Sequence, residues 1–310
     1  MKIYKPNFWD KKKSIISIIL IPLSIIYNFL LFLKTKLIKS ENFQVPIICI
    51  GNIYVGGTGK TPLAMEMYKI FKEKKYNPTI IKKFYINHLD EQEMIKENNL
   101  VLISSKNRKK GIYDAIKEKY NLIILDDGFQ DLSINKSLNI LCFKSTKLLG
   151  NGRLLPAGPL REKIESLKKV QIIMINGNIN KEFENKILSI NKNIKIYYSK
   201  YVPLNLENFK FKKVVAFSGI GEPNNFYQLL ERNNVQIKKK FTFPDHYNFK
   251  EREIKEIVNY AEKNNFILIT TEKDYYRIIK KYRKKISYLK LKIDIENKKR
   301  FVQDIMEYIK

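Results

Sequence analysis

Cysteine and histidine are scarce in this chain of 310 residues, and their scarcity excludes several kinds of site. There are two cysteines, Cys49 and Cys142, and two histidines, His88 and His246. Because neither cysteine belongs to a CxxC pair, we expect neither a zinc site nor a disulfide framework. Both cysteines fall inside apolar runs, which predicts small buried side chains in a protein of a reducing compartment.

Acidic residues are also few, since 31 Asp and Glu stand against 59 Lys and Arg, giving a formal net charge of +28. A positive charge of this size favours anionic partners such as nucleic acid, phospholipid headgroups or phosphorylated substrates. The abundance of Lys, Asn and Ile throughout is also typical of AT-rich coding sequence, in which a lysine surface needs no partner. No basic run is interleaved with aromatic residues as in a base-stacking platform, so we expect no nucleic-acid partner.

One long apolar segment, residues 14–33, contains no charged residue and has lysines on both sides. Its length approaches the roughly 20 residues of a membrane-spanning helix, but Pro22 interrupts it and several polar residues lower its hydrophobicity. No small-residue cleavage site follows, which argues against a signal peptide. We predict an anchor in the membrane interface with its lysines on an anionic membrane surface. A single membrane span and a buried core helix are the alternatives.

The most informative segment is residues 45–61, VPIICIGNIYVGGTGKT, an apolar run followed by a glycine-rich loop and Lys-Thr. The glycines let successive backbone N–H groups point at a phosphate, Lys60 adds charge on the terminal phosphates, and Thr61 would hold Mg²⁺. Tyr54 stands where the common motif has its first glycine, and a chance glycine-rich turn is the alternative. The predicted nucleotide-binding residues of this loop are Gly56, Gly57, Thr58, Gly59, Lys60 and Thr61.

A second apolar run, residues 122–125, ends in two carboxylates, Asp126 and Asp127, where the metal-holding acid of a P-loop enzyme is expected. Strand geometry sends the two side chains to opposite sides, so one would reach Mg²⁺ directly or through water while the other faces the substrate or orients the helix side. The sequence leaves open which carboxylate has which role. An ordinary Asp-Asp-Gly turn is the alternative.

Two further segments contain candidate residues. Residues 149–162, LGNGRLLPAGPLRE, predict a rigid loop in which Arg153 or Arg161 neutralises phosphoryl charge, with a plain structural turn as the alternative. His246 lies in the segment FPDHY, at a polar break in the second half of the chain. It is a candidate acid-base residue, and a surface loop histidine is the alternative.

Short apolar runs alternate with helical segments, which predicts an α/β protein with a parallel sheet. We expect a P-loop NTPase-like domain, a second, smaller α/β domain and an N-terminal membrane-associated helix. The expected boundaries are 1–40 for the helix, 41–205 for the P-loop domain and 206–310 for the smaller domain. The strand-like runs are residues 47–50, 79–81, 100–103, 122–125, 138–143, 170–175, 214–217, 267–270 and 286–291.

The segments GNIYVGGTGKTP, LDDGFQ, GNGRLLPAGPLRE, AFSGIGEP, FPDHY and TTEKD occur in an order and spacing that resemble the tetraacyldisaccharide 4'-kinase family of lipid A biosynthesis. The resemblance covers nearly the whole chain. It implies a kinase that uses ATP and Mg²⁺ to phosphorylate the 4'-hydroxyl of an acylated glucosamine disaccharide 1-phosphate, giving lipid IVA. It also implies work at the cytoplasmic face of the bacterial inner membrane, and we expect a monomer. The rival function is a membrane-tethered P-loop ATPase or switch that binds nucleic acid.

The same resemblance implies that Asp90 is the catalytic base and that His246 assists it. Three departures from the family pattern are visible. Gln92 replaces the proline of an Asp-Glu-Pro element, residues 82–85 replace an Arg-Gly-Tyr-Gly segment, and Asp131 replaces a histidine. The resemblance also implies that Lys60 and Thr61 contact the phosphates and Mg²⁺, and that Asp126 and Asp127 contact the metal and nearby water. It places Arg161 and Glu162 on the nucleotide or substrate side of the site. Lys60 and Asp127 are further implied to take part in catalysis.

Overall fold

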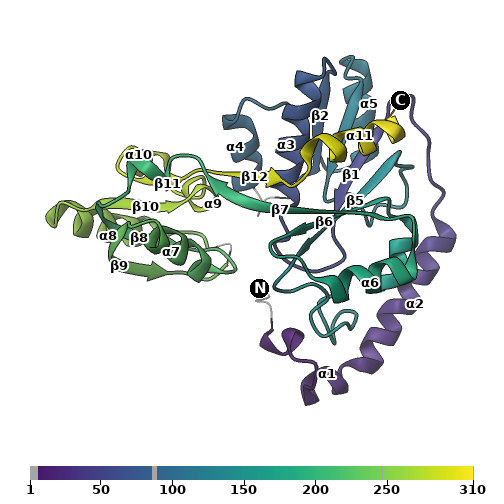
Figure 1. Ribbon diagram of the computed structural model, residues 1–310, viewed down its shortest axis with the longest axis horizontal. Coiled ribbons are helices and arrows are strands. Elements are labelled where there is room, and N and C mark those ends of the chain that lie inside the picture. Colours follow the sequence, from purple (N-terminus) through teal and green to yellow (C-terminus); the bar gives the residue numbers. More distant parts are fainter. Residues whose placement is uncertain (1–5, 86–88, 246, 310) are drawn as a thin grey trace. The chain divides into compact units, whose positions relative to one another are not determined.

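The computed structural model describes residues 6–85, 89–245 and 247–309 (Figure 1). The described chain divides into two compact units, and each is discontinuous in sequence. The first unit consists of Met1–Phe84, Leu100–Lys200 and Ile293–Lys310, and the second of Tyr85–Asn99 and Tyr201–Lys292.

This division differs from the expected boundaries at 40 and 205. Residues 85–99 belong to the second unit because α4 (Leu89–Glu97) carries Asp90, which forms an ion pair with Arg277 of that unit. Residues 293–310 belong to the first unit because α11 (Lys298–Ile309) buries Phe301 completely, with its ring against Tyr197. Linear inspection could not reveal either exchange, because each depends on contacts between distant segments.

An eight-stranded sheet forms the centre of the first unit, in the order β12-β7-β6-β5-β1-β4-β2-β3. Neighbouring strands from β7 to β3 pair in parallel, so the prediction of a parallel sheet is confirmed. Every residue of β1 and β4 is buried, which explains their continuous apolar sequence. The strands are β1 (Ile47–Gly51), β2 (Pro78–Lys83), β3 (Leu102–Ser105), β4 (Leu122–Asp126), β5 (Leu138–Lys144), β6 (Ile172–Asn176), β7 (Lys195–Pro203) and β12 (Leu291–Ile295).

The helices of the first unit pack on this sheet through apolar faces. Leu63, Met67 and Phe71 of α3 are buried at helical spacing, so this helix rests on the strands that hold the phosphate loop. Together with α11, the helices are α3 (Lys60–Glu73), α5 (Arg108–Lys117) and α6 (Lys181–Ile190), and short 3₁₀ segments are η1 (Asn7–Asp10) and η3 (Ile164–Lys169).

The second unit contains a four-stranded parallel sheet in the order β11-β10-β8-β9. Val214 and Ala216 of β8 contribute to one apolar cluster, while Val215 and Phe217 contribute to another, as alternation along a strand requires. Strand β9 was not predicted, because this edge strand is mostly exposed and rich in lysine. The elements are β8 (Lys213–Ser218), β9 (Gln236–Thr242), β10 (Ile267–Thr271), β11 (Ser287–Leu289), η4 (Leu206–Asn208), α4, α7 (Pro223–Arg232), α8 (Glu251–Lys263), α9 (Glu272–Tyr275) and α10 (Lys280–Arg283).

The apolar N-terminal segment forms two helices, α1 (Ile15–Ile19) and α2 (Ile21–Leu37), shown in purple in Figure 1. Pro22 lies in the first turn of α2, where a missing N–H is tolerated, so the segment breaks just before it. Among the described residues, no helix has both the length and the apolar character needed to cross a membrane. The segment does not match a buried core helix either, because these large apolar side chains are exposed: Ile15, Ile16, Ile18, Ile19, Leu23, Ile25, Ile26, Phe29, Leu30, Phe32, Leu33 and Leu37.

Candidate active site

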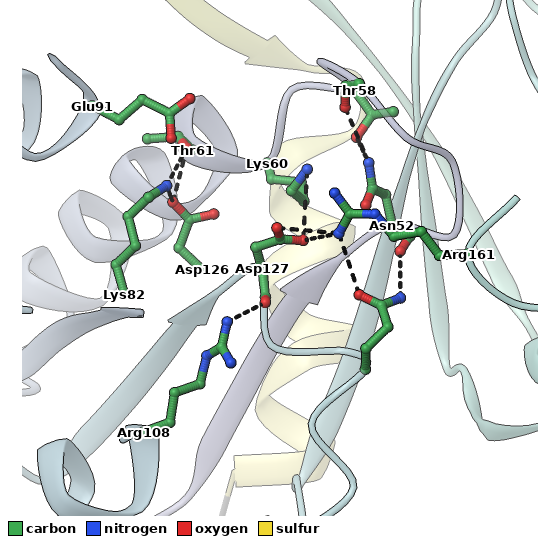
Figure 2. Close-up of polar contacts among 12 residues, drawn as sticks. Asn52, Thr58, Lys60, Thr61, Lys82, Glu91, Arg108, Asp126, Asp127 and Arg161 are labelled. Atoms are coloured by element: carbon green, nitrogen blue, oxygen red, sulfur yellow. Dashed lines mark hydrogen bonds and ion pairs between the residues drawn. The ribbon is translucent and has the colours of Figure 1, made fainter. Parts of the chain in front are cut away.

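The glycine-rich loop connects β1 to α3 and ends at the first turn of that helix. Gly59 is the residue before α3 and has φ of 93°, a left-handed conformation that favours glycine. The Asn52 side-chain amide donates to the carbonyl oxygen of Gly56 over 3.2 Å and to Thr58 Oγ1 over 3.1 Å, which braces the loop from inside (Figure 2). The backbone N–H groups at the start of α3 therefore face a preformed loop, the arrangement that binds phosphate groups.

Asp126 ends β4 and is completely buried beside the first turn of α3. Thr61 Oγ1 donates to Asp126 Oδ2 over 2.8 Å, and the Lys82 ammonium lies 2.5 Å from the same oxygen and 3.2 Å from Thr61 Oγ1 (Figure 2). Asp126 Oδ1 has no hydrogen-bond partner among the described residues. A buried carboxylate oxygen without a partner, next to a hydroxyl, is a donor set that fits a hard divalent cation.

Asp127 turns away from Asp126 and meets a different set of cations. Its carboxylate lies 3.1 and 3.2 Å from Arg161 Nη1 and 3.7 Å from Lys60 Nζ (Figure 2). Burial raises the pKa of Asp127, but the charges of Lys60 and Arg161 outweigh that effect and hold it below its ordinary value. The carboxylate thus stays ionised and fixes two cations beside the phosphate loop.

The backbone at Asp127 is strained and clamped on both sides. Its φ of 60° is uncommon for a residue other than glycine. The Asp127 N–H donates to the Ile50 carbonyl over 2.8 Å, and its own carbonyl accepts from Arg108 Nη2 over 2.6 Å. These bonds hold the carboxylate in place against the strain.

The loop of residues 149–162 pairs with the entry to the phosphate loop. Arg161 N–H donates to the Ile53 carbonyl over 2.7 Å, and Val55 N–H donates to the Pro159 carbonyl over 2.9 Å. Arg161 is thereby placed on Asp127, whereas Arg153 Nη1 donates to Ser17 Oγ of α1 over 2.7 Å. Of the two arginines that the sequence left open, Arg161 is the one beside the phosphate loop.

The neighbouring Glu162 is half-buried, and burial raises the pKa of its carboxyl while a hydrogen bond with Gln130 opposes that rise. Gln130 also donates to the Asn52 carbonyl over 2.8 Å and lies 3.4 Å from Arg161 Nη1. Gln130 therefore joins the arginine loop to the phosphate loop.

Asp90 lies in the second unit and is buried on α4. Its Oδ2 accepts from Arg277 Nε over 2.8 Å and lies 2.7 Å from Arg277 Nη2, whereas Oδ1 has no hydrogen-bond partner among the described residues. Arg277 Nη1 in turn donates to Asp274 Oδ1 over 3.0 Å. His246 lies outside the described residues, so its pairing with Asp90 stays a prediction.

Sequence reasoning missed three side chains of the site, Lys82, Arg108 and Gln130. A signal existed for Lys82, because it lies one residue before the end of β2, in register with Asp126 on the adjacent parallel strand. Polar residues at the same end of neighbouring parallel strands meet at one edge of the sheet. Arg108 and Gln130 gave no such signal. Among the described residues, no group of three or more His, Cys, Asp or Glu is arranged to hold a metal ion.

A parallel sheet in which a glycine loop joins a central strand to a helix, with Thr61 bonded to an aspartate on the adjacent strand, defines a P-loop NTPase-like protein. Within that class, residues 16–310 match the family described as LpxK, tetraacyldisaccharide-1-P 4'-kinase. The chain belongs to this family, as its motifs indicated.

Curated relatives agree with the family match. The chain is 40% identical to the tetraacyldisaccharide 4'-kinase of Pelagibacter ubique, with 99% of this chain and 98% of that protein covered. It is 34% identical to the same enzyme of Rickettsia canadensis, with 89% of each chain covered. A crystal structure of LpxK from Aquifex aeolicus in complex with ATP has the same fold, with a TM-score of 0.73 at 23% identity over 96% of this chain and 100% of that chain. The predicted fold class is confirmed.

Proposed function

We propose that the protein transfers the γ-phosphoryl group of ATP to the 4'-hydroxyl of tetraacyldisaccharide 1-phosphate, giving lipid IVA. Family membership supports the reaction, and one observation carries the site assignment. Lys60 and Arg161 converge on Asp127 next to the glycine-rich loop, which supports a role for these two cations in binding the terminal phosphates of a nucleotide. The family match does not favour the rival nucleic-acid switch.

The cations and carboxylates divide the work of phosphoryl transfer. Lys60 binds the terminal phosphates, and Arg161 neutralises the charge that develops on the transferring group. Asp127 holds both cations in position through its ionised carboxylate. Since phosphoryl transfer requires mainly positioning and charge neutralisation, these fixed contacts account for most of the expected rate enhancement.

Thr61 and Asp126 would hold Mg²⁺, and Asp127 would contact it directly or through water. The partnerless oxygen of Asp126 and the adjacent Thr61 hydroxyl support this assignment. A metal ion held by these residues would supply positive charge that offsets the charge of the phosphate groups. The Lys82 ammonium already balances the charge of Asp126 in the structure.

Asp90, assisted by His246, accepts the proton of the sugar hydroxyl in this proposal. One oxygen of the Asp90 carboxylate is held by Arg277, and the other has no hydrogen-bond partner among the described residues. A fixed carboxylate with an oxygen left for a proton has the arrangement that a general base needs. Arg161 and Glu162 bind the nucleotide or the substrate.

The protein is proposed to act on the cytoplasmic face of the inner membrane. The exposed apolar residues of α1 and α2, such as Ile15 and Phe29, would enter the interface, and the flanking lysines would contact anionic headgroups. The protein would bind its acylated substrate at that same membrane surface. As the sequence led us to expect, we propose that the protein acts as a monomer and has no nucleic-acid partner.

Radiolabelled ATP and tetraacyldisaccharide 1-phosphate in mixed micelles test the function directly. Label should pass to the 4'-position of the lipid in the presence of Mg²⁺, and chelation of Mg²⁺ should stop the transfer. A parallel assay should show no retention of single- or double-stranded nucleic acid at physiological salt. ATP hydrolysis without lipid phosphorylation, together with nucleic-acid binding, would establish the rival function instead.

A further inference from the structure

The helices α1 and α2 have a polar side as well as the exposed apolar one. Ser17 of α1 and Ser24 and Tyr27 of α2 lie on that polar side, and the spacing of three residues brings Ser24 and Tyr27 to one face of α2. Ser17 and Ser24 are buried and Tyr27 is half-buried, whereas Ile26 and Phe29 beside them are more than half exposed. Hydroxyl groups therefore connect these two helices to the rest of the first unit.

These hydroxyls all bond to one loop, residues 149–162. Ser17 Oγ donates to the Ala157 carbonyl over 2.6 Å. Ser24 Oγ donates to the Leu154 carbonyl over 2.9 Å and accepts from Ala157 N–H over 3.1 Å. The loop that carries Arg161 is thus fixed on one side by the N-terminal helices.

Tyr27 makes the contact nearest to the site. Its hydroxyl donates to the Arg161 backbone carbonyl over 2.9 Å. Because Arg161 N–H is bonded to the Ile53 carbonyl at the entry of the phosphate loop, both peptide groups of this residue are anchored. The Arg161 guanidinium then projects onto Asp127 from a backbone held between α2 and the phosphate loop.

The chemistry of Tyr27 suits this task. Its ring packs against the core cluster of the first unit, which fixes the direction of the hydroxyl. Burial and the nearby Glu162 carboxylate raise the pKa of Tyr27, with the Arg161 charge opposing them, so the phenol keeps its proton and remains a donor. Without this donor, the partly buried Arg161 carbonyl would lose its hydrogen bond.

We propose that Tyr27 is a positioning residue for Arg161, so that the helix facing the membrane also supports the phosphoryl-transfer site. The inference rests on the proposed role of Arg161 in that transfer. It gives α2 two separate tasks on opposite faces. The apolar side chains contact lipid, and the Tyr27 hydroxyl sets the backbone from which the arginine projects.

Tyr27→Phe in the full-length chain removes the hydroxyl and keeps the ring. We expect kcat in mixed micelles to fall about three- to tenfold, with KM for ATP changed less than about twofold, since Arg161 acts chiefly on the developing charge. Tyr113→Phe is the matched control, because it removes an exposed hydroxyl that bonds to Glu41 and should leave kcat unchanged. Replacing Tyr27 by 4-aminophenylalanine, which keeps a donor at the same position, should restore most of the lost kcat.

A double variant shows whether Tyr27 acts through Arg161. If it does, Tyr27→Phe lowers kcat much less in an Arg161→Ala background than in the wild type. Equal fold-losses in both backgrounds, or a wild-type kcat for Tyr27→Phe beside a defective Arg161→Ala, would overturn the positioning role and leave the proposed function standing. A wild-type kcat for Arg161→Ala would remove the proposed role of Arg161 and this inference with it. Should Tyr27→Phe fold poorly, the 4-aminophenylalanine variant and its double variant decide the question.

Discussion

Thr61 and Asp126 share a 2.8 Å hydrogen bond although 65 positions separate them in the sequence. The bond forms because Asp126 lies in register with Ile50 on the adjacent strand β1, and the phosphate loop brings the chain back to α3 beside it. The same carboxylate receives the Lys82 ammonium from the strand on its other side. Helix α3 and strands β4 and β2 therefore bring one hydroxyl, one carboxylate and one cation to a single buried position.

Lys60→Ala should abolish phosphoryl transfer and leave the protein folded, because the terminal phosphates lose a fixed charge. We expect a loss of about 10²-fold or more in kcat, measured with radiolabelled ATP. Lys69→Ala, on an exposed position of the same helix, is the control and should behave as wild type. Turnover near that of the control would disprove the assignment of Lys60.

Lys82→Met should destabilise the protein, since the completely buried Asp126 would lose its counter-charge. Removing one partner of a buried ion pair costs about 3–5 kcal/mol. If Asp126 holds Mg²⁺, the ion should compensate for the missing ammonium, so millimolar Mg²⁺ should raise the melting temperature of the variant more than that of the wild type. An equal response of both proteins to Mg²⁺ would argue against Asp126 as a metal ligand.

Asp127 should make part of the stability dependent on pH. Its folded pKa lies below the ordinary value of 3.8, so its contribution is fully present above that value and is lost as the pH falls through the folded pKa. The free energies of unfolding of the wild type and Asp127→Asn, measured with urea, should therefore differ most above about pH 5. The two values should converge as the pH falls through the folded pKa of Asp127. A difference that grows as the pH falls would have the wrong sign for this carboxylate.

Phe29→Ser should weaken binding to vesicles that contain anionic lipid, because Phe29 belongs to the exposed apolar side of α2. Burial of an aromatic side chain contributes about 1.5–3 kcal/mol. We therefore expect the vesicle–water partition coefficient, measured by sedimentation with the vesicles, to fall about tenfold or more. Ile179→Ser is the matched control, since Ile179 is 60% exposed and lies outside these helices. Equal losses for both variants would point to a general effect of surface hydrophobicity.

Asp90 and His246 should act as one catalytic unit. We compare the losses of kcat, expressed as free energies, in Asp90→Ala, His246→Ala and the double variant. The loss in the double variant should be clearly smaller than the sum of the losses in the two single variants. Additive losses would indicate independent roles. If Asp90→Ala retains full activity while Glu91→Ala or Asp127→Ala has none, the base lies elsewhere and the assignment of Asp90 must be withdrawn.

The parallel sheet was predictable because its inner strands are buried on both faces and therefore read as unbroken apolar runs. The two motifs of the site were also legible, since Lys60 and Thr61 follow the glycine loop directly, and Asp126 and Asp127 end an apolar run. Apolar strands and short motifs of this kind can be recognised in the sequence because each consists of residues that are adjacent in the chain.

Other parts of the molecule depend on contacts that local sequence does not record. Strand β9 pairs with β8 through its backbone while its lysines face solvent, so no apolar alternation marks it. Arg108 reaches the Asp127 carbonyl from a helix end with no motif of its own. The polar side of α1 and α2 was equally hidden, because the serines and the tyrosine of an apolar segment only lower its hydrophobicity when the sequence is read alone.

The exchange of segments between the two units also constrains how the protein is made. The sheet and helices of the first unit include β12 and α11, which follow the whole of Tyr201–Lys292 in the chain. During synthesis, Phe301 reaches its place against Tyr197 only after the second unit has left the ribosome. The edge strand β12 and helix α11 are therefore added to the first unit last, and a nascent chain without residues 293–310 leaves the Tyr197 ring without its contact to Phe301.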